Sequence, residues 1–322
     1  MISVIMPVKN GAETIEVALQ SILNQTFQDF EIIVIDDHST DNTVNIVNAL
    51  AEKTGKIRII KNGKSLGVAT SLNLALQNAK YEYVARMDAD DESLPDRLKL
   101  QHDYLQKNPN IAVVGGQVLF MGSTSQHDYH LRYETNSELI KKEMLKNNQL
   151  SHPAVMYRKS VILQLGGYRD FFKNAEDYDL WLRLLRHSYE ISNLDTLIIR
   201  YNLSIGGATI ANRWIQYVYH RLAQHAYYFP EDTLNETLYK NIESKYISLR
   251  LNYFIATHAL TLNCLLKCRQ FKKAWAIFKL IPNKLSFYSI KKILLAVIRG
   301  LFKIGKGSNV NEFYMLYDIP VP

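Results

Sequence analysis

The sequence predicts an α/β fold: a Rossmann-like, mostly parallel sheet covered by helices, followed by an α-helical C-terminal region. Three observations support this prediction. Short apolar runs alternate with segments of helical periodicity through the first part of the chain, which is the pattern of successive β–α units. The apolar run at residues 31–35 is nearly all β-branched, as expected for a parallel strand that is buried on both faces. Beyond Arg213, every periodic segment is helical.

The order of these segments predicts the individual elements. The apolar runs predict strands at residues 2–6, 31–35, 56–60 and 81–87, and the periodic segments between them predict helices at 12–23, 43–50 and 68–79. After a helix that begins near Pro95, the pattern becomes mixed. It predicts strands at 112–120, 154–157 and 196–201, and helices at 138–147 and 176–186. The helix at residues 176–186 should bury an apolar face formed by Leu180, Trp181, Leu184 and Leu185.

Length and charge divide the chain into two regions. Its 322 residues are 47% hydrophobic, which is enough for one large domain and an extension. Residues 213–322 hold 16 Lys and Arg against 6 Asp and Glu, whereas residues 1–212 hold 22 against 25. We therefore predict one domain at residues 1–212 and a helical, basic region at 213–322, with different partners.

The sequence favours a cytoplasmic protein. The N-terminus lacks the basic leader and long apolar run of a signal peptide. The best candidate for a membrane span, residues 246–266, is interrupted by polar and charged side chains. Cys264 and Cys268 lie one helical turn apart, but no second Cys or His pair completes a zinc site. We expect both to be small core residues in a reducing compartment.

Polar and acidic residues follow the predicted strands. Residues 7–11 follow the first strand, residues 36–39 the second and residues 88–91 the fourth. In α/β sheets, ligands bind at the carboxyl ends of the strands. These three segments are therefore the first candidates for a functional site.

Asp88, Asp90 and Asp91 form an acidic cluster directly after an apolar strand. Such close carboxylates repel one another unless a cation or solvent compensates them. Carboxylate oxygens suit Mg²⁺ or Mn²⁺, which bind few protein groups together with substrate phosphates. The alternative is a solvated turn, or caps for the helix that begins near Pro95.

Two further acidic segments have both a functional and a structural interpretation. Asp36 and Asp37 stand where an acid commonly binds a nucleoside, but Ser39 or Asp41 of the same segment could cap the next helix. The segment 174–181 places three acids at the start of an amphipathic helix. Taken alone, that placement is explained by the helix dipole, although an anchored acid there could also act as a general base.

Four segments together resemble the family 2 glycosyltransferases. They are 3–10 (SVIMPVKN), 29–41 (DFEIIVIDDHSTD), 85–91 (ARMDADD) and 176–181 (EDYDLW), and they occur in the family's order over residues 1–205. Each segment is modest alone, whereas the ordered set is specific. The resemblance implies a GT-A fold, a nucleotide-sugar donor, a Mn²⁺ or Mg²⁺ ion and an inverting transfer.

The resemblance also implies roles for individual residues. Asp88 and Asp90 match the DxD pair, with Asp90 closest to the metal, and Asp177 matches the catalytic base. Lys9 departs from the aromatic residue often found at its position, which leaves stacking on the base open. The residues that match the nucleotide-binding set are Pro7, Val8, Asn10, Asp37 and Asp88.

Other parts of the family pattern concern the sugar and the acceptor. His152 resembles a position often found in bacterial members of the family, and holding the sugar or the acceptor is one interpretation of it; a satisfied loop histidine is an equal alternative. Glu176 is a second candidate for substrate binding. Gly166 and Gly167 resemble the turn that precedes the base helix. No Gln-x-x-Arg-Trp segment follows residue 181, which argues against a processive synthase.

These matches imply a metal-dependent inverting hexosyl- or N-acetylhexosaminyltransferase. Its donor would be UDP-linked, and its acceptor a hydroxyl of a saccharide or lipid-linked saccharide in the synthesis of lipopolysaccharide, capsule or exopolysaccharide. The non-enzymatic alternative is a degenerate protein that binds sugar nucleotides or acts as a scaffold. The presence of both Asp90 and Asp177 argues against it.

The basic tail has its strongest pattern at residues 291–306. Lys292, Arg299, Lys303 and Lys306 fall on one helical face with aliphatic residues opposite. Such a helix can lie on an anionic membrane surface, here the inner face of the cell membrane. The alternative is a packed helix with a solvated basic face. No nucleic-acid-binding module is recognisable, so we expect no nucleic-acid partner.

Overall fold

The structure, a computed structural model, describes residues 1–121, 129–202 and 213–229. The chain forms two compact units. Unit 1 contains residues 1–118, 133–171 and 176–202, and unit 2 contains residues 119–132, 172–175 and 203–322. Of the predicted helical region, α9 (Arg213–Tyr228) is described. The cysteine pair, the segment 246–266 and the basic segment 291–306 lie outside the described residues.

The first four strands form the predicted parallel sheet. β1 pairs in parallel with β2 on one side and with β4 on the other, and β2 pairs in parallel with β3. The spatial order is therefore β3-β2-β1-β4. The bounds of these strands are β1 (Ile2–Val8), β2 (Phe30–Asp36), β3 (Ile57–Lys61) and β4 (Tyr83–Arg86).

The rest of the sheet is partly antiparallel. β8 (Met156–Arg158) pairs antiparallel with both β4 and β6 (Ile111–Phe120). Next in order come β9 (Glu190–Tyr201) and β5 (Glu92–Ser93), which pair antiparallel with each other. β7 (Tyr129–Leu131) pairs with β6, so the described residues form nine strands in one sheet. Antiparallel partners need no crossover helix, which is why the alternating pattern fades after β4.

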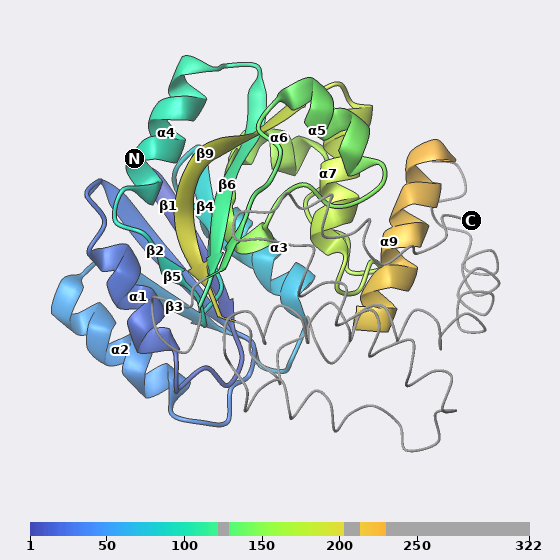
Figure 1. Ribbon diagram of the computed structural model, residues 1–322. Helices are drawn as coiled ribbons and strands as arrows, with labels where there is room; N and C mark the ends of the chain where they lie inside the picture. Colours follow the sequence, from blue (N-terminus) through green and yellow to red (C-terminus); the bar gives the residue numbers. More distant parts are fainter. Residues whose placement is uncertain (122–128, 203–212, 230–322) are drawn as a thin grey trace, which may run out of the picture. The chain divides into compact units, whose positions relative to one another are not determined.

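Helices cover the sheet of unit 1 (Figure 1). α3 packs against β1 and β2, while α2 contacts β3 and α1. The buried side chains of β1 and β2, such as Val4, Ile32 and Val34, form the centre of the core. The helices are α1 (Ile15–Leu23), α2 (Thr43–Thr54), α3 (Val68–Asn78), α4 (Arg97–Lys107), α5 (Ser137–Met144), α6 (Lys159–Gln164) and α7 (Glu176–Arg186).

Several predicted boundaries were wrong. β1 extends through Pro7 and Val8, which were predicted to follow it. Proline is tolerated there because β4 ends opposite Ile5, so β1 has a paired strand on one side at that level. The sequence did not predict α6, β5 or β7, which are too short for a periodic pattern. In the described part of the chain, no helix has the length and apolar character needed to cross a bilayer.

Candidate active site

The strand order creates a switch point between β1 and β4. β2 and β3 lie on one side of β1, and β4 lies on the other. In α/β sheets, ligands bind outside the carboxyl ends of the strands at such a switch point, so the predicted segments 7–11 and 88–91 flank the expected site.

The loops after β1 and β2 are joined by hydrogen bonds. The backbone N–H of Asn10 donates to Ser39 Oγ at 2.9 Å, and Asn10 Oδ1 accepts from the backbone N–H of Thr40 at 2.8 Å. Asp41 Oδ2 accepts from the N–H of Ala12 at 3.0 Å. These bonds join the loop after β1 to the loop after β2, and α1 begins at Ile15 rather than at the predicted residue 12. The side chain of Asn10 thus shapes the loop that was predicted to line the nucleoside.

Asp37 anchors the loop that leads into α3. Its carboxylate accepts hydrogen bonds from Asn62 Nδ2 (2.8 Å), Ser65 Oγ (2.7 Å), Leu66 N (2.7 Å) and Gly67 N (3.1 Å). Burial alone would raise its pKa, but the four bonds together lower it below the ordinary value. A carboxylate has about four lone-pair sites, so a nucleobase at Asp37 would share them with this loop.

Lys9 reaches the same loop. Its Nζ donates to Ser65 Oγ at 3.1 Å, and Ser65 in turn donates to Asp37. The residue that departs from the family's aromatic position is therefore hydrogen-bonded to the Asp37 network.

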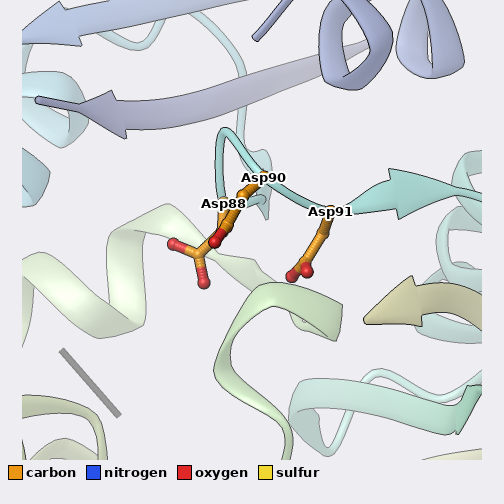
Figure 2. A group of neighbouring side chains, drawn as sticks. All are labelled: Asp88, Asp90 and Asp91. Atoms are coloured by element: carbon orange, nitrogen blue, oxygen red, sulfur yellow. The ribbon is translucent and has the colours of Figure 1, made fainter. Parts of the chain in front are cut away.

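The three acids after β4 lie close together. A carboxylate oxygen of each of Asp88, Asp90 and Asp91 lies within 4.8 Å of the others. Figure 2 shows the three side chains pointing to the same side of the turn. Asp88 and Asp90 are half-buried and Asp91 is buried. Hard oxygen ligands at this spacing fit Mg²⁺ or Mn²⁺.

Arg86, at the end of β4, holds Asp88 in a bidentate ion pair. Nη2 lies 2.6 Å from Oδ1, and Nη1 donates to Oδ2 at 2.7 Å. The Arg86 side chain is only 5% exposed, so the pair supplies the charge that compensates a buried guanidinium. Because both oxygens of Asp88 contact Arg86, Asp90 is the better placed of the two to ligate an ion. The sequence did not single out Arg86, although an Arg two residues before an acid in a strand lies on the same face.

The sequence assigned no role to Asp91. Its side chain is buried, with the residue 1% exposed, and its Oδ1 accepts a hydrogen bond from the backbone N–H of Asn202 at 2.9 Å. Burial raises its pKa well above the ordinary value, and the charges of Asp88 and Asp90 raise it further. Arg97 stands close enough for its charge to act on Asp91, and it donates to the carbonyl of Arg86 at 2.6 Å. The acidic cluster therefore includes one buried acid, Asp91, on which the charge of the buried Arg97 acts.

The acids at the start of α7 fall into two kinds. Asp179 is a structural residue, since it forms ion pairs with Arg169 and Arg183. Glu176 and Asp177 are 6% and 9% exposed, and no ion pair to either is found within the described residues. Burial raises the pKa of both; that of Glu176 reaches about 8, with the charge of Asp177 contributing.

Electrostatics links these acids to the cluster after β4. The charge of Arg86 lowers the pKa of both Glu176 and Asp177, and the charge of Asp88 raises that of Glu176. The structure therefore brings the acidic cluster and the acids of α7 into one neighbourhood.

Comparison with known proteins identifies the family. The model of Glycosyl transferase family 2 matches residues 3–166, about half of the chain. The chain belongs to glycosyltransferase family 2. It is 35% identical over 210 residues to the O-antigen biosynthesis glycosyltransferase WbnJ of Escherichia coli, covering 63% of this chain and 80% of that protein.

A further relative agrees with this placement, and solved structures share the fold. The chain is 28% identical over 205 residues to WfgD of Escherichia coli, a UDP-Glc:alpha-D-GlcNAc-diphosphoundecaprenol beta-1,3-glucosyltransferase, covering 63% of this chain and 78% of that protein. Staphylococcus aureus TarS 1–349 in complex with UDP has a TM-score of 0.53 and 22% identity, covering 93% of this chain and 90% of that one. The mannosyltransferase PcManGT of Pyrobaculum calidifontis, in complex with GDP-Man and Mn²⁺, has a TM-score of 0.55 and 17% identity. The match covers 94% of this chain and 81% of that one. The predicted GT-A fold is confirmed.

In this glycosyltransferase, a clamped glycine turn precedes α7. Gly166 and Gly167 have φ angles of 80° and 71°. The amide of Asn73 donates to the carbonyl of Tyr168 at 2.7 Å and accepts from its N–H at 2.8 Å. Arg183 donates to the carbonyl of Gly167 at 2.6 Å. The turn is therefore fixed from both α3 and α7.

His152 lies beside this turn. Its Nε2 is 3.1 Å from the hydroxyl of Tyr168, and its ring packs edge-on against Trp181. Burial, assisted by the charge of Arg86, lowers its pKa well below the ordinary value, so the imidazole is neutral. The interior contact agrees with the structural alternative, while substrate binding at His152 stays a prediction.

Substitutions at the glycine turn test its geometry. Gly166→Ala should cost about 1–2 kcal/mol of unfolding free energy from left-handed strain alone, since a Cβ there meets nothing within 4 Å. Gly167→Ala should cost roughly a further 1–3 kcal/mol, because its Cβ would collide with Asn73 Oδ1.

Urea denaturation measures both values. Gly63→Ala, whose Cβ also meets nothing and whose φ is not positive, is the control. Equal losses at residues 166 and 167 would contradict the clamp by Asn73.

Proposed function

We propose that this glycosyltransferase moves a hexosyl or N-acetylhexosaminyl group, with inversion, from a UDP-sugar to a hydroxyl of a saccharide or lipid-linked saccharide during the synthesis of a surface polysaccharide. The observation that carries the proposal is the pair of buried acids, Glu176 and Asp177, on which the charge of Arg86 acts while Arg86 is ion-paired with Asp88 of the acidic cluster. The names of WbnJ and WfgD and the UDP complex of TarS support the donor and the pathway.

The nucleotide would lie over the loops after β1, β2 and β4. Pro7, Val8 and Asn10 would line the nucleoside. Asp37 would accept a hydrogen bond from the nucleobase on a lone pair that it shares with the loop leading into α3. Mn²⁺ or Mg²⁺, held by Asp90 with Asp88 beside it, would neutralise charge on the diphosphate leaving group. Arg86 keeps Asp88 oriented for that role.

Asp177 would accept the proton of the acceptor hydroxyl, whose oxygen then attacks the anomeric carbon from the face opposite the leaving group. A single displacement of this kind needs one carboxylate base and no enzyme nucleophile. A base must be deprotonated to act, and burial raises the pKa of Asp177. Activity should therefore fall as the pH drops through that raised pKa. Glu176, protonated at neutral pH, would donate a hydrogen bond to the substrate.

The base assignment is tested by Asp177→Asn. Because the amide cannot accept the proton, UDP release from UDP-glucose or UDP-GlcNAc should fall by about 100-fold or more, the usual range for loss of a general base. UDP affinity, measured by calorimetry, should change little. Asp170→Asn, at an exposed acid in the segment before α7, is the control. Wild-type turnover in Asp177→Asn would refute the assignment, whereas absence of turnover in the wild type itself would favour the degenerate alternative.

The metal assignment is tested by Asp90→Asn. Losing a charged ligand should weaken Mn²⁺ binding in the presence of UDP about tenfold or more, equivalent to about 1.4 kcal/mol. Asp103→Asn removes the same charge from a half-buried position in α4, where it pairs with Lys99, and should leave the affinity unchanged. Equal affinities of Asp90→Asn and the wild type, measured by Mn²⁺ paramagnetic resonance, would rule out Asp90 as a ligand.

We also propose that residues 1–212 form the catalytic domain, and that residues 213–322 bind the inner face of the cell membrane. The excess of Lys and Arg after residue 213 supports this contact. Full-length protein should therefore sediment with anionic liposomes at low salt and be released by high salt. Protein that stays in the supernatant at low salt would contradict the membrane contact.

A further inference from the structure

The loop between α5 and the short helical turn η2 (His152–Ala154) is fixed against the helix that carries Asp177. Tyr178 donates its hydroxyl to the carbonyl of Met144 at 2.6 Å. Asn193, in β9, donates to the carbonyl of Gln149 at 2.9 Å. The loop is therefore held at both of its ends, by α7 and by the sheet.

Asn148 lies between these two anchors and faces Asp177. Its Nδ2 donates to Asp177 Oδ2 at 3.0 Å. The orientation of an asparagine amide has to be inferred from its partners, and here they agree. Asn148 Oδ1 accepts from the backbone N–H of Leu150 at 3.1 Å, and a backbone N–H can only donate. The NH₂ end of the amide must therefore be the end that meets Asp177.

Asp177 needs such a partner because its surroundings oppose its charge. It is 9% exposed, and no ion pair to it is found within the described residues. A buried carboxylate without hydrogen bonds takes up a proton, whereas donors to its charged form keep it ionised and restrict its rotamers. Among those donors are the amide of Asn148 and the backbone N–H of Tyr178.

We propose that Asn148 is a positioning residue for the base, which holds the Asp177 carboxylate in one orientation at the start of α7. The proposal rests on the proposed function, since it takes Asp177 to be the base. The bond spans the loop after α5 and the first turn of α7, so it joins the base to a part of the fold outside the four family motifs.

Other charged and titratable groups around Asp177 also influence its pKa, and the effect of losing the Asn148 hydrogen bond adds to theirs. Arg86 acts from β4 and favours the charged carboxylate. Glu176, on the same helix, is coupled to Asp177, and Tyr168 acts from the turn before α7. None of these groups is altered by a change at Asn148. Loss of the amide should therefore raise the pKa of Asp177 and move the acidic limb of the pH–rate profile upward.

Two substitutions separate positioning from loop folding. Asn148→Ala removes the bonds to both Asp177 and Leu150. Asn148→Asp keeps an acceptor for the N–H of Leu150 but replaces the donor with a second acid. If Asn148 only shaped the loop, Asn148→Asp would behave like the wild type. If it positions the base, Asn148→Asp should be the more damaging change at neutral pH.

The experiment is a titration of the full-length chain with ¹³C-labelled aspartate carboxyls, followed by NMR. The Asp177 resonance is the one missing from Asp177→Asn. Its midpoint should rise by about one pH unit in Asn148→Ala, and by more in Asn148→Asp, as expected for losing a hydrogen bond to a charged group. Asn108→Ala, which removes a hydrogen bond to Tyr104 at the end of α4, should not move it. An unchanged midpoint in both Asn148 variants overturns the proposal.

The release of UDP from UDP-glucose and UDP-GlcNAc in the same variants separates this proposal from the base assignment. The acidic limb should shift together with the NMR midpoint, and turnover should recover at high pH in Asn148→Ala. If Asp177→Asn keeps wild-type turnover, the base assignment fails, and the role of Asn148 fails with it. If Asp177→Asn is inactive but the limb stays in place in both Asn148 variants, only the role of Asn148 fails.

Discussion

The buried ion pair between Arg86 and Asp88 is the interaction on which the site depends. A guanidinium at the end of a buried strand is costly to desolvate, and the bidentate contact with Asp88 offsets that cost. The same cation acts on Glu176, Asp177, Asp91 and His152, favouring the charged acids and the neutral imidazole. Without it, the site would hold several buried acids with little positive charge to balance them.

The backbone around this pair is fixed by polar contacts rather than by apolar packing alone. Arg97 donates to the carbonyl of Arg86, and the N–H of Arg86 donates to the carbonyl of Val155. On the other side of the site, Asn73 and Arg183 fix the turn before α7. These hydrogen bonds restrict the backbone that carries Arg86 and the turn that precedes the acids of α7.

Much of this arrangement could be predicted from the sequence, because it depends on local patterns. Apolar runs revealed β1 to β4, and the position of Asp88 to Asp91 after a strand revealed the acidic edge. The pair of Arg86 with Asp88 is local in sequence, but its effect on Glu176, Asp177 and His152 could not be predicted, because these groups become its neighbours only when the chain folds. Asn148 was missed for the same reason: its 3.0 Å bond crosses 29 positions of sequence.

The contrast between Asp37 and Asp177 shows how one side-chain type can take two roles. Both are buried, and burial alone would raise the pKa of each. Asp37 receives four hydrogen bonds from one loop, and its pKa falls below the ordinary value, so it stays charged and anchors that loop. At Asp177 the donors do not outweigh burial, and the pKa stays raised. Environments that push the pKa values of similar groups apart distinguish anchors from proton acceptors. By that criterion, Asp177 is suited to take a proton from an acceptor, whereas Asp37 is suited to hold the nucleotide side of the site in place.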